Sequence, residues 1–319
     1  MSAMIIIDNG TKKPLIPVVL DDVEWSLERT GTAGKLTFKV VADKKLKIDE
    51  GNQVRFIWNG QNVFFGWIFT RKFSKDGIVS ITAYDQLRYF KNKDTMVFEG
   101  KTATEIIKSI IQKYQLKSGE LADTKYKFPS VVEDNQTLFD IVNNALSDTV
   151  MYTKSLFVLY DDFGKLVLKN IKDMAVKIII DSETAQDFDY SSSIDENTYN
   201  KVKIIFDNED TGSRDVFIAQ DQKNINKWGV LQYFDKLKKG ENGVEKVNQL
   251  LSMYNKKTRK LTIKDAFGDL RVRAGSRVAV LMTVDDVVLS NYMLVESCKH
   301  KFKQDEHTME LKLRGGEFV

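Results

Sequence analysis

Two stretches of this sequence, 224 positions apart, share the same order of glycine, polar and apolar residues. The first covers residues 51–56 and begins at Gly51, and the second covers 275–280 and begins at Gly275. A repeat of this kind constrains the fold strongly, because similar segments are expected to form similar structural units. The later parts of the two copies are Trp67-Ile68-Phe69 against Tyr292-Met293-Leu294, and residues 79–83 against 309–313.

Two interpretations of the repeat are open. Any two β-hairpins resemble each other to some extent, so the match can be a general property of hairpins. The alternative is a pair of related β-barrel domains at the two ends of the chain, with an α/β insertion between them. The length of 319 residues corresponds to about two average domains of ~150 residues, which is compatible with the second interpretation.

Short segments in which apolar and polar residues alternate predict a mainly β protein. Leu36, Phe38 and Val40, for example, lie on one face of such a segment. Asn59-Gly60 is typical of a two-residue hairpin turn, and residues 161–164 are expected to form the turn of another hairpin. The predicted strands cover residues 35–40, 54–58, 63–65, 155–160 and 165–169.

Three segments with helical periodicity interrupt the strands. The first follows Thr102, where Glu105 completes a capping box. The second follows Asp134-Asn135, and the third begins near Asn242. Each has an apolar stripe that predicts packing against a core. The stripes are Ile106, Ile107, Ile110, Ile111 and Tyr114; Leu138, Ile141, Val142 and Ala145; and Val247, Leu250, Leu251 and Tyr254.

These patterns predict a mainly β fold class with an α+β middle section. We expect a first β-barrel domain over residues 1–95, an α/β middle domain over 96–190, and a second β-barrel domain over 191–319. The third helix is expected as an insertion near 242–256 in the second barrel domain.

The scarcity of histidine and cysteine removes most metal and nucleophile chemistry. The chain has two His and one Cys, too few for a centre of several soft ligands. Cys298 cannot form an internal disulfide and is predicted to be a buried thiol in a strand. His300 and His307 are predicted to face solvent from strand and turn positions. We therefore expect no catalytic, cofactor-binding or metal-binding residues and no cofactor.

Two short motifs resemble known sites but predict turns. Asp162-Phe163-Gly164 matches the metal-binding tripeptide of protein kinases, but no glycine-rich loop or H-R-D motif accompanies it. Residues 207–212 resemble a calcium loop, but Ile218 occupies the position of the bidentate glutamate. A carboxylate pair for glycoside hydrolysis stays open, because none of the 45 acidic residues has a local signature. We expect a protein that is not an enzyme.

Charge and hydropathy indicate neither a specific nucleic-acid partner nor a membrane. The formal net charge is only +3. The basic clusters Lys236-Lys238-Lys239 and Lys256-Lys257-Arg259-Lys260 are short and predict solvated surface. Asp8 interrupts the opening apolar run, so no secretory signal is expected. No segment approaches the ~20 apolar residues of a membrane helix, so we expect a protein made in the cytoplasm.

Several residue runs resemble those of one protein family. They start with Ala83-Tyr84-Asp85, end with Gly315-Gly316-Glu317-Phe318, and follow the same order along nearly the whole chain. The family is that of the baseplate hub proteins of contractile phage tails, in particular the XkdQ/YqbQ family of prophages and phage-tail-like bacteriocins. No single run is diagnostic, and the resemblance depends on all of them together. The other runs are residues 101–107, 133–141, 159–166, 224–234 and 271–275.

The resemblance implies a structural hub. In such a hub two barrel domains related to the tail tube protein are joined by smaller α/β domains, and three chains form a ring. The ring adapts the six-fold tail tube to the three-fold central spike. The implied partners are two further copies of the chain, the tail tube protein, the central spike protein, and other baseplate and LysM-type hub-associated proteins. No membrane contact is implied, and DNA only passes through the lumen.

The family also implies a location and leaves some choices open. We expect the protein in the baseplate of a virion or phage-tail-like particle that assembles in the bacterial cytoplasm. A DNA-delivering phage and a DNA-free R-type bacteriocin are both compatible. Because the chain stops at Val319, directly after the second barrel-like strand, any spike or lytic domain is expected on a separate polypeptide.

Two other functions are kept as alternatives. One is a tail-associated hydrolase that cuts cell-wall glycan or peptide. The other is a host-surface binding module with an exposed aromatic platform that includes Trp228 and Tyr233. Ordinary packing in a core or a subunit interface is the competing interpretation of these two aromatic residues.

Overall fold

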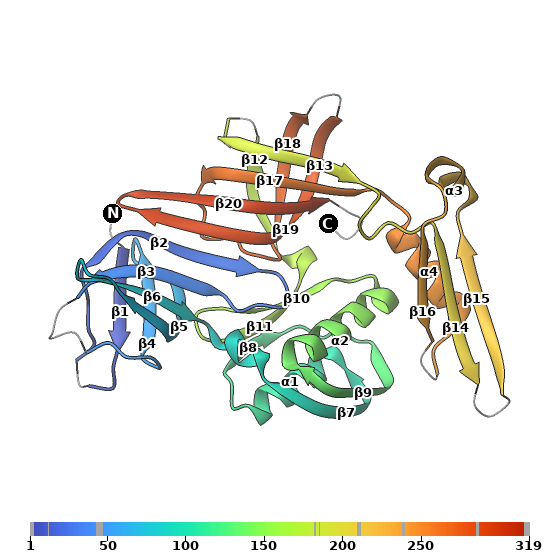
Figure 1. The fold of residues 1–319 in the computed structure, drawn as a ribbon, viewed down its shortest axis with the longest axis horizontal. Helices are drawn as coiled ribbons and strands as arrows, with labels where there is room; N and C mark the ends of the chain where they lie inside the picture. The colour runs from blue at the N-terminus through green and yellow to red at the C-terminus, as the bar shows by residue number, and fades with distance from the viewer. Residues whose placement is uncertain are drawn as a thin grey trace.

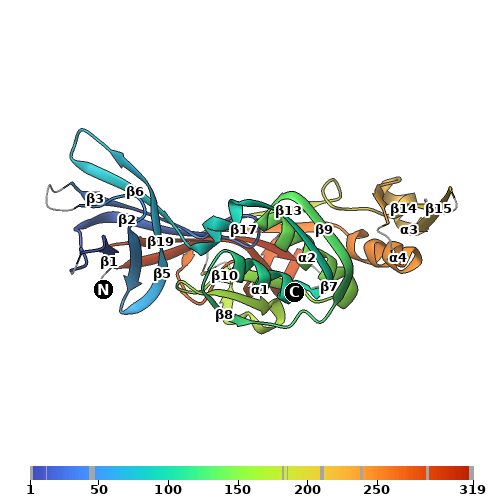
Figure 2. The ribbon, with the colours of Figure 1, turned by 90° about the horizontal axis from the view of Figure 1, so that it is seen from below.

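The main feature of the fold is a 12-stranded sheet built from both ends of the chain. The computed structural model describes residues 3–11, 13–42, 47–181, 183–184, 186–208, 212–237, 240–284 and 287–315. The N-terminal strands (blue) and the C-terminal strands (red) lie side by side, and the middle of the chain (green) lies below them in the view of Figure 1. Residues 201–254 form a separate unit at one end of the molecule (Figures 1 and 2).

Residues 3–84 form the first half of the large sheet, which we call the first half-sheet. Its strand order is β1-β4-β5-β6-β3-β2. The predicted strand over 35–40 and the hairpin around Asn59-Gly60 are both present. The strands are β1 (Ala3–Asp8), β2 (Val19–Glu28), β3 (Lys35–Val41), β4 (Gln53–Trp58), β5 (Gln61–Phe73) and β6 (Ile78–Tyr84).

The second half-sheet comes from residues near and after position 175. Its strand order is β12-β18-β19-β20-β17-β13, and the two half-sheets are joined by the antiparallel ladder between β2 and β19. The strands are β12 (Ala175–Ile180), β13 (Asp187–Ser193), β17 (Thr258–Phe267), β18 (Arg277–Val284), β19 (Val287–Lys303) and β20 (Glu306–Gly315).

The middle of the chain packs two helices against two small sheets. The sheets are the β7–β9 pair and the three strands β10-β11-β8, and the apolar stripes of α1 and α2 are buried with them in one core. The elements are the 3₁₀ turns η1 (Gln86–Lys91) and η2 (Ile171–Asp173), the strands β7 (Lys93–Thr102), β8 (Ser118–Leu121), β9 (Lys127–Thr137), β10 (Phe157–Asp161) and β11 (Leu166–Asn170), and the helices α1 (Ala103–Lys113) and α2 (Leu138–Thr153).

A third unit is inserted between β13 and β17. Its sheet has the order β15-β14-β16, and Val202 and Ile204 of β14 pack against Val247 and Leu250 of α4. The predicted helix near Asn242 is α4, whereas α3 and the sheet have no counterpart in the sequence predictions. The elements are β14 (Lys201–Asn208), β15 (Ser213–Gln220), α3 (Gln222–Trp228), β16 (Gln232–Lys236) and α4 (Gly243–Tyr254).

The internal repeat is confirmed as two half-sheets with the same strand order. Gly51 and Gly275 both have positive φ, +87° and +94°. The N–H of Gly51 donates to Ile68 O, and that of Gly275 donates to Val295 O, each over 2.8 Å. Both copies therefore begin with the same glycine turn hydrogen-bonded to the same partner strand.

The partner strands also share an irregularity. In β5 the pairing with β6 shifts between Ile68 and Thr70, and in β19 the pairing with β20 shifts between Val295 and Ser297. These bulges establish that residue 68 corresponds to residue 295, which is an offset of 227 positions along β5 and β19. A β-bulge at the same place in both copies is a feature that unrelated hairpins do not share by chance.

One detail of the predicted repeat is wrong. The sequence repeat aligns Trp67 with Tyr292. In the structure Trp67 pairs with Gln53 in β4, and Arg277 of β18, which corresponds to Gln53, pairs with Leu294. Trp67 therefore corresponds to Leu294. The error is two residues. Because side chains alternate with a period of two along a strand, a two-residue shift keeps every apolar residue on the same face and leaves no trace in the pattern.

The two half-sheets differ at their outer strand. β1 is antiparallel to β4, whereas β12 is parallel to β18. The fold is therefore mainly β with an α+β middle section, as predicted. Its two six-stranded halves are equivalent in strand order and differ in how the chain enters them.

Candidate functional site

Three of the family-like residue runs meet at one buried joint between the large sheet and the middle of the chain. Asp85 follows β6, Asp161 ends β10, and Arg273 lies just before β18. Gln86 lies beside Asp85, and the exposed fractions of Asp85, Gln86 and Asp161 are 4%, 2% and 7%. We call Asp85, Gln86, Asp161 and Arg273 the polar joint.

Gln86 connects the joint to two segments of the middle section. Its Nε2 donates to Asp161 Oδ2 over 3.0 Å, and its Oε1 accepts from the N–H of Lys117 over 2.8 Å. The other oxygen of Asp161 accepts from the N–H of Gly164 over 2.6 Å. This last bond closes the turn at Asp162-Phe163-Gly164, so the prediction of a hairpin turn there is confirmed.

Asp85 connects the joint to the first half-sheet. Its two oxygens accept from the N–H groups of Gly34 and Leu87, each over 2.9 Å. Burial, and then the nearby charge of Asp161, raise the pKa of Asp85 well above its ordinary value. The two backbone donors act in the opposite direction, because they favour the ionised carboxylate.

Arg273 brings the second half-sheet into the same cluster. Its Nη2 donates to the carbonyl oxygen of Asp161 over 2.7 Å, and its guanidinium lies 3.7 Å from the centre of the Tyr160 ring. Burial lowers the pKa of Arg273. The Arg273 side chain is largely buried, with an exposed fraction of 15%. A largely buried cation held by a carbonyl, an aromatic face and nearby carboxylates fixes three parts of the chain relative to one another, because loss of a partner leaves its charge less well compensated.

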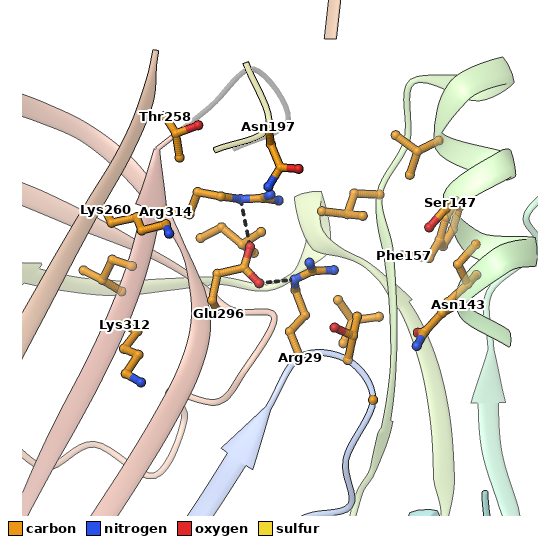
Figure 3. Close-up of a pocket in the computed structure, with 18 of the residues that line it drawn as sticks. Arg29, Asn143, Ser147, Phe157, Asn197, Thr258, Lys260, Glu296, Lys312 and Arg314 are labelled. Atoms are coloured by element: carbon orange, nitrogen blue, oxygen red, sulfur yellow. Dashed lines mark hydrogen bonds and ion pairs between the residues drawn. The ribbon is translucent and has the colours of Figure 1, made fainter. Parts of the chain in front are cut away.

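A cavity of about 750 Å³ separates helix α2 from the second half-sheet. Figure 3 shows Ser147 and Asn143 of α2 on one side and Lys260, Lys312 and Arg314 on the other. Glu296 lies between two arginines in this cavity. Its Oε2 is 2.6 Å from Arg29 Nε, and its Oε1 is 2.8 Å from Arg314 Nε.

The arrangement in this cavity suits structure better than catalysis. Glu296 is the one carboxylate among the described lining residues, and both of its oxygens face arginines. The same lining contains serine and threonine hydroxyls but no His or Cys to activate them, whereas a nucleophile normally needs such a base within hydrogen-bond reach. The ion pairs instead join Arg29 of the first half-sheet to β19 and β20 of the second.

The prediction that both histidines face solvent is wrong for His300, while His307 is partly exposed. His300 is fully buried, with an exposed fraction of 0%, and its ring stacks on Trp25 of β2 with centroids 5.1 Å apart. β19 and β20 face each other across a tight turn, so residues seven apart come together. The sequence pattern missed this because it placed His307 in the turn and not in β20.

The two imidazoles share one hydrogen-bond chain. His300 Nε2 lies 2.9 Å from Val272 O, and His300 Nδ1 lies 2.9 Å from His307 Nε2. A carbonyl oxygen only accepts, so Nε2 of His300 donates and its Nδ1 accepts from His307. Burial lowers the pKa of His300 to about 3 and that of His307 to about 4. Both are neutral packing residues at neutral pH.

Cys298 is a buried thiol, as predicted. Its exposed fraction is 1%, its Sγ lies 3.1 Å from His300 Nε2, and burial raises its pKa. A thiol with a raised pKa is a poor nucleophile at neutral pH. Among the residues that the structure describes, no three His, Cys, Asp or Glu side chains come together as a possible metal site.

Trp228 and Tyr233 do not form the exposed aromatic platform that a host-surface binding module would need. Tyr233 packs against Tyr199 and Tyr254, with ring centroids 5.3 and 5.6 Å away, so internal packing is its role. Trp228 lines a smaller cavity together with Lys256 and Lys257.

The remaining sequence motifs are surface features or only partly described. Lys257, Arg259 and Lys260 are exposed, as predicted for a solvated cluster, and Lys260 pairs with Glu196. Within the described ranges, no helix is long and apolar enough to cross a membrane. Residues 209–211 of the calcium-like segment, Lys238-Lys239 and the terminal Gly316-Glu317-Phe318 lie outside the described residues.

The fold is that of a prophage tail protein. It superposes on the 43 kDa tail protein of prophage MuSo2 from Shewanella oneidensis with a TM-score of 0.70 and 13% identity, covering 97% of this chain and 98% of that one. The polar joint, built from residue runs that were singled out in the sequence, is the internal framework of this tail-protein fold.

The chain belongs to the YQBQ-like family, whose model matches residues 23–314. It is 30% identical over 302 residues to the uncharacterized protein YqbQ of Bacillus subtilis strain 168, covering 92% of this chain and 90% of that protein. It is also 28% identical over 270 residues to the phage-like element PBSX protein XkdQ of the same strain, covering 83% of this chain and 81% of XkdQ. A structural role in a phage-type tail is the function that family and fold support together.

Proposed function

We propose that this protein is the structural baseplate hub of a contractile tail or phage-tail-like particle. Its role is to adapt the six-fold tail tube to the three-fold central spike. The observation that carries the proposal is the internal repeat, because two half-sheets of equal strand order give each chain two similar units. Three such chains present six similar units to the tube while keeping three-fold symmetry towards the spike.

In this proposal each half-sheet closes as a barrel related to the tube protein, and the chain acts as a homotrimer. The domains are those expected from the sequence, residues 1–95, 96–190 and 191–319, with the unit around α4 inserted in the last. The partners are the tube protein, the spike protein and other baseplate proteins, in a particle assembled in the bacterial cytoplasm. The proposed protein has no catalytic role and needs no cofactor.

The internal contacts support a rigid adaptor. The polar joint ties both half-sheets to the middle section through buried hydrogen bonds, and the Arg29–Glu296–Arg314 ion pairs tie the half-sheets to each other. A part that transmits symmetry between two assemblies requires its own halves to keep a fixed relative orientation.

The test is to isolate tails from producing cells and to determine the position and stoichiometry of this chain by electron microscopy and quantitative mass spectrometry. We expect three copies at the junction of tube and spike. Absence of the chain from intact tails, or six copies along the tube, would overturn the proposal. Peptidoglycan zymography of the purified protein separates the hydrolase alternative, since turnover abolished by a single Glu→Gln or Asp→Asn change would favour an enzyme.

A further inference from the structure

Among the strand edges of the large sheet that lack a partner within the described residues, two are related to each other by the internal repeat. β13 pairs only with β17, along its whole length. Residues 70–73 of β5 pair with β6 on one side, while on the other side the backbone hydrogen bonds of β5 end at Ile68, which bonds to Gly51 and Asn52. An unpaired edge presents a row of backbone donors and acceptors that can accept another strand.

The internal repeat relates these two free edges to a ladder that exists inside the chain. β5 corresponds to β19 with an offset of 227, from the shared bulge. Leu36 of β3 pairs with Ala83 of β6, and Leu261 of β17 pairs with the equivalent residue of β20, Leu313, so Leu36 corresponds to Leu261. Trp25 of β2 pairs with Leu36, and Tyr190 of β13 pairs with Leu261. β2 therefore corresponds to β13 with an offset of 165. The ladder between β2 and β19 therefore has an equivalent, β13 against β5, that a single chain does not form.

We propose that β13 of one copy pairs antiparallel with residues 70–73 of β5 in the next copy, repeating between chains the ladder that β2 and β19 make within one chain. This inference rests on the proposed hub function, which requires several copies in a ring. Transferring the observed register gives the new pairs. The observed pairs of β2 and β19 are Glu28–Ser297, Leu27–Cys298, Ser26–Lys299 and Trp25–His300. In the same order, the corresponding pairs between chains are Ser193–Thr70, Ser192–Arg71, Ser191–Lys72 and Tyr190–Phe73.

The side chains on the free edges fit this pairing. Phe73 is 69% exposed, although its counterpart His300 is fully buried under Trp25. In the proposed ladder Phe73 lies opposite Tyr190, so an aromatic pair replaces the stack of Trp25 on His300. Directly opposed aromatic residues are a favourable cross-strand pair. The proposal thus accounts for a large apolar side chain that a single copy leaves in solvent.

The neighbouring positions are also complementary. Glu296, which pairs with Arg29 at the internal ladder, corresponds to Phe69, and Arg29 corresponds to Ile194. The ion pair inside the chain thus becomes an apolar pair between chains.

The contact is heterologous, since different surfaces of the two copies meet. Such contacts close into a ring when the rotation between neighbours returns to the start, and neither the β13 edge nor the β5 edge then remains free. In a ring of three chains the ladder occurs alternately within and between chains, which places all six half-sheets in equivalent surroundings. The free edges of β13 and β5 are in that case the residue-level basis of the six-fold side of the adaptor.

Cysteine cross-linking tests the pairing in assembled particles. Producing cells carry Lys72→Cys together with Ser191→Cys, and isolated tails are treated with an oxidant or a short bis-maleimide. Cys298 stays in place because it is buried. We expect covalent species of two and three chains on a non-reducing gel. The matched control combines Lys72→Cys with Ser213→Cys on β15 of the inserted unit, and it should stay monomeric under the same treatment.

The outcomes separate the inference from the proposed function. Tails that contain the chain but give no cross-link with Lys72→Cys and Ser191→Cys overturn the ladder and leave the hub intact. Tails that lack the chain overturn both. A second variant, Phe73→Asp, should keep the melting temperature of the isolated chain because Phe73 is exposed, and should weaken self-association at least tenfold by analytical ultracentrifugation. Unchanged association of Phe73→Asp would also contradict the ladder.

Discussion

At the scale of single residues, the two repeat glycines form a natural comparison. Gly51 and Gly275 have the same left-handed backbone, but a Cβ on Gly275 would lie 2.9 Å from Val158, whereas one on Gly51 would meet nothing within 4 Å. We expect Gly51→Ala to cost about 1–2 kcal/mol through backbone strain alone, and Gly275→Ala to cost about 1–3 kcal/mol more through overpacking. Urea unfolding measures both, and equal losses would contradict the role of Val158.

Arg273 and Arg271 offer a second matched pair. Arg273 is part of the polar joint, while the side chain of Arg271 is 66% exposed and pairs with Asp269. Removing one partner of a buried charge cluster typically costs about 3–5 kcal/mol, and we expect a loss of this size for Arg273→Leu. For Arg271→Leu we expect about 0–1 kcal/mol. Similar unfolding midpoints for the two variants would show that the joint does not stabilise the fold.

Residue-level prediction from the sequence succeeded where a single local property decides and failed where a contact decides. Cys298 lies in a strand segment where its neighbours Ser297 and Lys299 are polar, and burial of the thiol follows from this local strand pattern. The burial of His300 depends on Trp25 of β2 and on His307 of β20. No local pattern contains these partners, because the β2–β19 ladder brings together residues 269 to 279 positions apart.

At the scale of elements, local signals placed the longer helices and the tight hairpins. Thr102 Oγ1 accepts from the N–H of Glu105, and Glu105 accepts from the N–H of Thr102, so the capping box defines the start of α1 as predicted. Helix α3 was missed because none of its seven residues is buried, which leaves no apolar stripe. The apolar residues Val216, Phe217 and Ile218 of β15 are consecutive and do not alternate, so this strand gave no period-2 signal.

The β19–β20 hairpin gives the fold a defined response to pH. The pKa values of His300 and His307 are lowered from 6.5 to about 3 and about 4, so below pH 6.5 the unfolded chain binds protons that the folded chain does not. Stability is therefore fully present above pH 6.5 and decreases as the pH falls towards 4. The slope for His300 is at most about 1.4 kcal/mol per pH unit, and the partly exposed His307 contributes less.

The raised pKa of Asp85 acts in the opposite direction, so the comparison has to be between variants. His300→Phe keeps an aromatic ring next to Trp25 and removes the more strongly shifted group. We expect this variant to be less stable than wild type at pH 7 and to lose less stability between pH 6.5 and 4.5. Urea midpoints across this range provide the measurement, and parallel curves for the two proteins would contradict the assignment.

At the scale of the whole molecule, the sequence revealed the repeat but not how its copies are joined. The offset of 224 between Gly51 and Gly275 was visible because both turns need the same residue type. The polar joint, which ties both copies to the middle section, was not visible, since it combines Asp85, Asp161 and Arg273 from three distant segments. The residue runs that carry the family resemblance contain all three of these residues. The resemblance to the family therefore singled out the polar joint, whereas the apolar periodicity of the strands and helices did not.

The same view of the molecule leads to an expectation about backbone protection. If β13 and β5 pair between chains, amides in residues 187–193 and 70–73 exchange slowly with deuterium in assembled tails and quickly in the isolated chain, because half of the amides of an edge strand have no sheet partner. β15 is an edge strand of the inserted unit and serves as the internal reference, with similar exchange in both states. Hydrogen exchange with mass spectrometry makes the comparison, and protection of β15 without protection of β13 would place the subunit contact on the inserted unit instead.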